Sequence, residues 1–156
     1  ELVKDRGYSL NKLYNELDEL NAKSVTVILD ACFSGNSRQT INYKSENISN
    51  TKGVRITMPE LSTRPWDTNP NFRLFTSSSA DQTSLGYDQS QSGLFTYFLA
   101  VGLQGESDTN NDGIILMDEL VKYVTDNVTK ESKNIRGGVQ TPQFYGNGNV
   151  IVEKIR

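Results

Sequence analysis

The stretch SVTVILDACFSGNS, residues 24–37, decides how the rest of the chain is interpreted. Residues 25–29 form an unbroken apolar run, which is typical of a central β-strand buried on both faces. The run ends at Asp30, and the chain's single cysteine, Cys32, follows two residues later. Ligands of open α/β sheets bind at the carboxyl ends of the strands, so we expect Asp30 and Cys32 to lie at such an edge.

The composition suits a globular domain and narrows the classes of partner. The chain has 156 residues, 35% of them hydrophobic and 22% charged, which indicates one domain or a large part of one. A net charge of −3 gives no reason to expect a nucleic acid or an anionic membrane as a partner. One cysteine cannot form an internal disulfide, so we expect a reducing compartment, the cytoplasm. The chain contains no histidine, and any imidazole that Cys32 needs must come from elsewhere.

Apolar periodicity predicts alternating helices and strands. Residues 9–21 are expected to form an amphipathic helix capped by Ser9, and residues 36–70 a long polar loop. The other expected elements are a strand at 72–76, a buried helix at 94–103, a helix at 117–128 and a strand at 149–155. This alternation predicts an α/β fold with a mainly parallel sheet flanked by helices. Because the strands are too few to bury a core, we expect residues 1–156 to be the C-terminal part of one domain whose N-terminal strands are missing from this chain.

Three segments together resemble one family. VTVILDACFSG resembles the nucleophile strand of the caspase-like cysteine peptidases, the group that holds caspases, metacaspases and their bacterial relatives. FRLFTSSSADQTSLGYDQSQSGLFTYFLAVGLQG is similar to the family's next strand, substrate-pocket loop and following helix, and VQTPQFYGNGNVIVEKI to its closing segment. The animal-caspase signature is Q-A-C-[RQG]-G, whereas Asp30 stands here in place of its glutamine. That departure resembles the metacaspase-like and bacterial branches, where D-x-C-x-S-G is the usual form.

The resemblance implies a peptidase whose nucleophile is Cys32. A neighbouring imidazole normally generates the thiolate, and in this family the histidine lies roughly 50 residues before the cysteine. Only 31 residues precede Cys32, and none is histidine, so we expect an N-terminal segment or chain of the same protein to supply it. The oxyanion would be bound by the Cys32 backbone N–H and by a glycine beside that histidine. The alternative is an inactive caspase-like scaffold that has lost the histidine and binds partners.

The resemblance also implies which peptides would be cut. Asp30 matches a position of the primary specificity pocket, where a carboxylate favours arginine or lysine before the cleaved bond. Asp81 is the expected second acid, and Leu85-Gly86 replaces the Trp-Arg pair with which caspases bind aspartate. The alternatives are that Asp30 caps a turn and that Asp81 is a solvated loop charge. If the pocket prefers basic residues, the loop at 36–70 carries four candidate self-cleavage sites: Lys44, Lys52, Arg55 and Arg64.

A second motif has its own chemistry. DTNNDGIILMDE, residues 108–119, fits the EF-hand loop template D-x-[DN]-x-[DN]-G-x5-E without a mismatch. A calcium ion would be bound by oxygen atoms of Asp108, Asn110, Asp112, Ile114 and Glu119. The alternative is a turn and helix cap, in which the aspartates turn the chain before a helix at Met117. A calcium-binding module in which Cys32 is incidental is therefore a third hypothesis, besides the peptidase and the scaffold.

Overall fold

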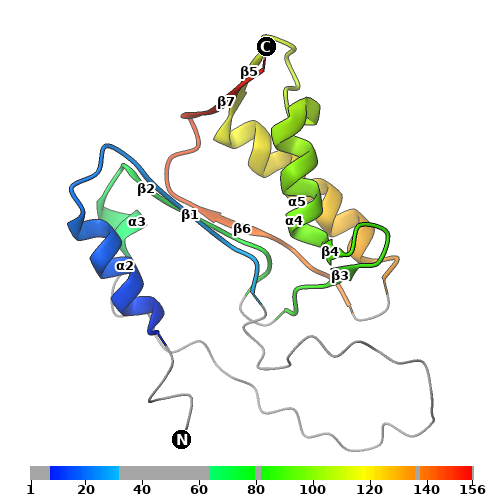
Figure 1. The fold of residues 1–156 in the computed structure, drawn as a ribbon, viewed down its shortest axis with the longest axis horizontal. Coiled ribbons are helices and arrows are strands. Elements are labelled where there is room, and N and C mark those ends of the chain that lie inside the picture. The colour runs from blue at the N-terminus through cyan, green and yellow to red at the C-terminus, as the bar shows by residue number, and fades with distance from the viewer. Residues whose placement is uncertain (1–7, 32–63, 80–81, 136–137, 156) are drawn as a thin grey trace, which may run out of the picture.

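The computed structural model describes residues 8–31, 64–79, 82–135 and 138–155, and it has the predicted α/β fold (Figure 1). Helices α2 (Leu10–Glu19) and α3 (Pro65–Thr68) lie on one side of the main sheet, and α4 (Leu94–Val101) and α5 (Met117–Ser132) on the other (Figure 1). A π-helical turn, η1 (Gly102–Glu106), continues α4. The strands are β1 (Val25–Leu29), β2 (Phe72–Thr76), β3 (Gly86–Tyr87), β4 (Ser92–Gly93), β5 (Ile114–Leu116), β6 (Gln143–Tyr145) and β7 (Ile151–Lys154).

The main sheet contains both parallel and antiparallel pairs. Its order is β1-β2-β6: β1 and β2 are parallel, as expected, and β6 adds to β2 in the antiparallel direction. Two further antiparallel pairs, β3 with β4 and β5 with β7, lie outside this sheet. The strand expected at 149–155 is thus β7, which pairs with β5 instead of joining the main sheet.

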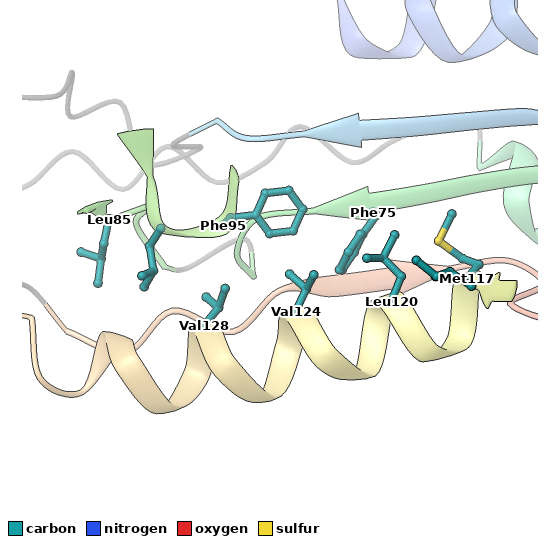
Figure 2. Packing of buried hydrophobic residues seen from close by; sticks show 9 residues of the cluster. Phe75, Leu85, Phe95, Met117, Leu120, Val124 and Val128 are labelled. Atoms are coloured by element: carbon teal, nitrogen blue, oxygen red, sulfur yellow. The ribbon is translucent and has the colours of Figure 1, made fainter. Parts of the chain in front are cut away.

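Strand β2 separates two hydrophobic cores. All five of its residues are buried, and they alternate between the two faces. Phe72 and Leu74 belong to a cluster with Tyr14 and Trp66, on the side of α2 and α3. Phe75 belongs to the other cluster, where α5 side chains point toward it and toward Phe95 (Figure 2). The buried members of that second cluster are Phe75, Leu85, Leu94, Phe95, Ile115, Met117, Leu120, Val124 and Val128.

The structure corrects the prediction that residues 25–29 are buried on both faces. In β1 the side chains of Thr26 and Ile28 are exposed, Ile28 to 39%, and only Val27 is buried. The reason is that Val25, Val27 and Leu29 pack into the cluster around Tyr14, whereas no residue of β1 belongs to the cluster around Phe75. The strand that is buried on both faces is therefore β2.

A short helix corrects the prediction of an uninterrupted loop at 36–70. Pro65 begins α3, where its fixed φ angle suits the first helical position. Trp66 is buried, with its ring 5.3 Å from that of Tyr14 and 5.6 Å from that of Tyr145. Helix α3 is a single turn held by one buried indole, so it is too short to show an apolar periodicity. For this reason the sequence did not predict it. Residues 36–63 of the predicted loop lie outside the described residues.

Three predicted helices differ in detail from those observed. Helix α2 begins after Ser9 as expected, but the Ser9 side chain makes no capping hydrogen bond. Helix α4 is buried only in its first turn, at Leu94 and Phe95, because its far side faces solvent at Thr96 and Ala100. Helix α5 continues to Ser132, beyond the expected end at residue 128. Within the part of the chain that is described, no helix has the length and apolar character needed to cross a membrane.

Candidate active site

The carboxyl ends of β1 and β2 form one polar edge of the sheet. Because the strands are parallel, Asp30 and Ser77, the residues that follow them, emerge together. The Ser77 N–H donates to the carbonyl oxygen of Leu29 at 2.9 Å. The Ser84 hydroxyl donates to the carbonyl oxygen of Ala31 at 3.4 Å and shares a short hydrogen bond with the Ser77 hydroxyl. The end of β1 and the polar run after β2 therefore lie together, as expected from the sequence.

Asp30 lies against the amino-terminal end of α4. Its Oδ2 accepts a hydrogen bond of 2.5 Å from the hydroxyl of Thr96, the third residue of that helix. Gly93 immediately precedes α4, and a Cβ atom at this position would overlap the Asp30 carboxylate. Negative charge is stabilised at a helix N-terminus, where backbone N–H groups lack intrahelical partners. One oxygen of Asp30 is thus bonded to α4, a helix 66 residues further along the chain, which differs from the turn cap of the alternative interpretation.

The second oxygen of the same carboxylate, Oδ1, makes no hydrogen bond to the described residues. Asp30 Oδ1 is buried and has no hydrogen-bond partner among the described residues. A buried acceptor without a donor costs about 1–3 kcal/mol, and more when the group is charged. At this edge of the sheet, Oδ1 is therefore a buried acceptor for which the described residues supply no donor.

Two of the predicted site residues, Cys32 and Asp81, lie outside the described residues. Ala31 ends the segment that leads to Cys32, and its carbonyl oxygen is the one that Ser84 contacts. Gln82 follows Asp81, and its Oε1 accepts a hydrogen bond from the Thr141 N–H at 2.7 Å. The chain next to each of these two residues is thus anchored, while their own side chains stay predictions.

Of the four residues predicted as self-cleavage sites, Arg64 is the one that the structure describes. Its Nε lies 3.2 Å from Asp67 Oδ2, and its guanidinium carbon lies 5.8 Å from the centre of the Trp66 ring. Cleavage after Arg64 would require both contacts to break. Lys44, Lys52 and Arg55 fall in the part of the loop that is not described.

Sequence reasoning missed a buried glutamine at this edge. The Gln140 side chain is fully buried; its Nε2 donates to the Ser77 carbonyl oxygen and its Oε1 accepts from the Leu85 N–H, both at 2.8 Å. Its backbone N–H donates to the Ser132 hydroxyl at 3.0 Å. The only signal in the sequence was its place in VQTPQ, a segment that resembles the family without indicating what the glutamine contacts.

The loop predicted to bind calcium is folded by hydrogen bonds within itself. Asp108 accepts from the N–H groups of Asp112 and Gly113, at 3.3 and 3.0 Å. The Asp112 N–H also donates to Asn110 Oδ1 at 2.9 Å, and the Ile114 N–H donates to Asp112 Oδ1 at 2.8 Å. Gly113 has a φ angle of 78°, which glycine adopts without strain. These are the contacts expected if the segment is a turn before β5 and α5.

Glu119, the expected bidentate ligand, caps the start of α5. It accepts from the Leu116 N–H at 3.0 Å and from the N–H and hydroxyl of Thr109 at 3.3 and 2.9 Å. The hydrogen bond from Leu116 is the largest cause that lowers the pKa of this carboxyl; the Thr109 groups add to it, and burial opposes it. Leu116 offers no side-chain oxygen, so only the Glu119 half of a capping box forms. In the described ranges no group of three or more His, Cys, Asp or Glu side chains is arranged to hold a metal ion.

Substituting Gly93 tests whether Asp30 is held where the structure has it. In Gly93→Ala the added Cβ would displace the Asp30 carboxylate and break its bond to Thr96, at a cost of about 1 kcal/mol or more in the free energy of unfolding. Gly86 faces Gly93 across β3 and β4 and has no atom within 4 Å of an added Cβ, so Gly86→Ala is the matched control. Urea unfolding should show a loss in Gly93→Ala alone. Equal losses in the two variants would contradict this placement of Asp30.

The Glu119 cap predicts a specific pH dependence. Because folding lowers the pKa of this carboxyl from its ordinary value of 4.5, its contribution is present above that pH and is lost as the pH falls through the lower, folded-state pKa. Glu119→Gln should therefore melt below wild type at neutral pH, and the difference should shrink below about pH 4.5. Glu106→Gln, at an exposed position in η1, serves as the control. A Glu119→Gln difference that is constant across this pH range would contradict the cap.

Comparison with known proteins supplies the family. A family model described as the caspase domain matches residues 10–149. Neither a curated protein nor a solved structure matches the chain. The matched residues cover most of the chain and include the segments that carry Asp30, Ser77 and Gln140. The chain therefore belongs to the caspase domain family, whose members are cysteine peptidases.

Proposed function

We propose that this domain is a cysteine endopeptidase that cleaves after arginine or lysine, with Cys32 as its nucleophile. The family indicates the class of enzyme, and the Asp30 carboxylate is the observation that carries the specificity. Its Oδ2 is satisfied by Thr96, whereas Oδ1 is buried without a partner in the described part of the chain. A guanidinium or ammonium group supplies N–H donors and no acceptor, which is what Oδ1 lacks. Charge-assisted hydrogen bonds of this kind are roughly twice as strong as neutral ones.

The position of Asp30 relative to the nucleophile supports the same proposal. Asp30 stands two residues before Cys32. If Asp30 binds the side chain of a substrate residue, the peptide bond that follows this residue would lie near the Cys32 thiol. Asp81 would be the second acid of the pocket. Its support is the anchoring of the neighbouring Gln82 by Thr141. The resemblance of DACFSG to D-x-C-x-S-G supports a place in the metacaspase-like or bacterial branch.

The proposed reaction proceeds through a thioester. The Cys32 thiolate attacks the carbonyl carbon of the scissile bond, and the resulting oxyanion accepts a hydrogen bond from the Cys32 backbone N–H. The C–N bond then breaks as the leaving amine takes a proton from an imidazolium. Water then hydrolyses the thioester and restores the thiol. This chain has no histidine, so the imidazole would come from a segment or chain of the same protein outside this sequence. The unpaired edge of β1 in the described residues, where Ile28 is 39% exposed, supports docking of such a segment beside Cys32.

The remaining expectations stand as parts of this proposal. A reducing compartment such as the cytoplasm suits an enzyme that depends on a free thiolate. Self-cleavage in the loop at 36–70 would use the same pocket, and cleavage at Arg64 would be opposed by its contacts with Asp67 and Trp66. Calcium binding at residues 108–119 stays a prediction. The carboxylates there accept hydrogen bonds from backbone N–H groups, which favours the alternative of a turn and helix cap. The scaffold without activity is the competing function, and the missing histidine is the observation that favours it.

Peptide hydrolysis by the complete protein, with the histidine-bearing segment present, tests the proposal. Fluorogenic peptides that end in arginine or lysine should be cleaved, those that end in aspartate should not, and Cys32→Ala should abolish cleavage. In Asp30→Asn, kcat/KM for the arginine peptide should fall roughly 10- to 100-fold, because hydrogen bonds to charged groups contribute about 1.5–3 kcal/mol. Asp88→Asn, at an exposed acid near β3, is the control.

Each other outcome has a distinct meaning. Cleavage after aspartate would contradict the role of Asp30 while leaving the enzyme in place. Failure to cleave any peptide, with or without calcium, would favour the scaffold.

A further inference from the structure

Gln140 connects the two parts of the chain between which Asp30 lies. On one side, its Nε2 donates to the carbonyl oxygen of Ser77 at 2.8 Å, and the Ser77 N–H donates to Leu29, the residue before Asp30. On the other side, its Oε1 accepts from the N–H of Leu85 at 2.8 Å. The Leu85 carbonyl oxygen in turn accepts from the N–H of Leu94, the first residue of α4, at 2.9 Å. A single side-chain amide thus joins the backbone before Asp30 to the helix that holds its Oδ2.

The residue type fits this task. The site requires a donor toward Ser77 and an acceptor toward Leu85 at the same time, and an amide is the uncharged side chain of this length that supplies both. Glutamate would supply only acceptors when ionised, and methionine would supply neither a strong donor nor a strong acceptor. Gln140 is fully buried, so no water can replace a bond that is lost.

The backbone that carries Gln140 is held by hydrogen bonds at two successive residues. The Ser132 hydroxyl, at the end of α5, accepts from the Gln140 N–H at 3.0 Å. A second connection runs in parallel one residue later, where Thr141 donates its N–H to Gln82 Oε1 at 2.7 Å. The segment after α5 therefore contacts the polar run after β2 at two successive residues. Gln140 is the one of the two whose side chain reaches the groups that flank Asp30.

We propose that Gln140 is a positioning residue for the specificity pocket: its amide sets the separation between the end of β1 and the start of α4, and so the placement of the Asp30 carboxylate. This inference rests on the proposed function. It predicts a selective effect on substrates. A guanidinium binds a carboxylate through a planar fork of donors, whereas an ammonium is a point charge on a flexible stem. Loosening the pocket should therefore reduce cleavage after arginine more than cleavage after lysine.

The test compares cleavage of arginine and lysine peptides by the complete protein and by four variants. In Gln140→Met, of similar size, kcat/KM for the arginine peptide should fall roughly 10- to 100-fold, mainly through KM, and the arginine-to-lysine ratio should fall as well. Leu17→Ala, which removes packing from the cluster around Tyr14 on the opposite side of the sheet, is the control for general destabilisation. Its ratio should stay at the wild-type value. If Gln140→Met does not fold, Gln82→Met can be used, because it removes the hydrogen bond between Gln82 and Thr141 at a partly buried position. It should lower the arginine-to-lysine ratio by less than the loss of the Gln140 amide would.

Gln140→Glu supplies a conservative variant whose effect can be reversed. A protonated carboxyl has the same donor and acceptor as the amide, and burial favours that neutral form. The arginine-to-lysine ratio of this variant should therefore return toward the wild-type value as the pH is lowered and fall as the pH rises. Comparing two substrates cancels the pH dependence of the thiolate and imidazole that they share. The ratio of Gln140→Met should not recover.

The outcomes separate this inference from the proposed function. Cleavage by wild type with an unchanged ratio in Gln140→Met, or an equal change in Leu17→Ala, would overturn the positioning role alone. An absence of cleavage by wild type would overturn the proposed function, and the positioning role with it. The result that we expect is a fall in the ratio that is largest in Gln140→Met, absent in Leu17→Ala and reversed by acid in Gln140→Glu.

Discussion

Burial of β2 along its whole length is the constraint on which the rest of the structure depends. Its residues alternate, so Phe72 and Leu74 pack toward α2 and α3 while Phe75 packs toward α4 and α5. A strand that serves two cores is held firmly in register with β1. Because the two strands are parallel, that register also determines what meets at their carboxyl ends. Asp30, the serines after β2 and the start of α4 are brought to one edge as a consequence of core packing.

One oxygen of the Asp30 carboxylate makes a hydrogen bond within the fold, and the other is buried without a donor among the described residues. Oδ2 contacts the start of α4 through Thr96, and the absence of a side chain at Gly93 makes room for it. Oδ1 is buried at the same place without a donor among the described residues. The structural contact with α4 and the proposed binding of a substrate cation therefore do not exclude each other. A carboxylate fixed by one oxygen loses little further freedom when the other binds a substrate cation.

The loop at 108–119 shows why a complete motif match can have a structural explanation. The template residues are present in order, but Asp108, Asp112 and Glu119 accept hydrogen bonds from backbone N–H groups of the loop and of β5. A turn that must enter a helix needs acceptors at nearly the same spacing as a calcium loop needs ligands. The sequence pattern does not distinguish the two uses.

The sequence predicted the elements whose signals are local and missed those that depend on distant contacts. The alternation of helices and strands gave the fold class, the run VTVILDACFSG led to the family, and Asp30 was placed at the end of a strand. Strand β6 is three half-buried residues, too short for a periodic signal. The prediction that β1 is buried on both faces was wrong, because an apolar run does not show which faces are covered: β1 contributes to the cluster around Tyr14 but not to the one around Phe75. Thr96 and Gln140 could not be foreseen, because they contact residues 66 and 55 positions away.

A structure of the complete protein with a peptidyl-arginine aldehyde bound at Cys32 tests the central claim most directly. Asp30 Oδ1 is the one buried oxygen at the edge of the sheet for which the described residues supply no donor. We expect the guanidinium of the inhibitor to donate to Oδ1 while the Thr96 hydroxyl continues to donate to Oδ2. A guanidinium bound away from Asp30, or an Oδ1 paired with a donor of the protein itself, would contradict it.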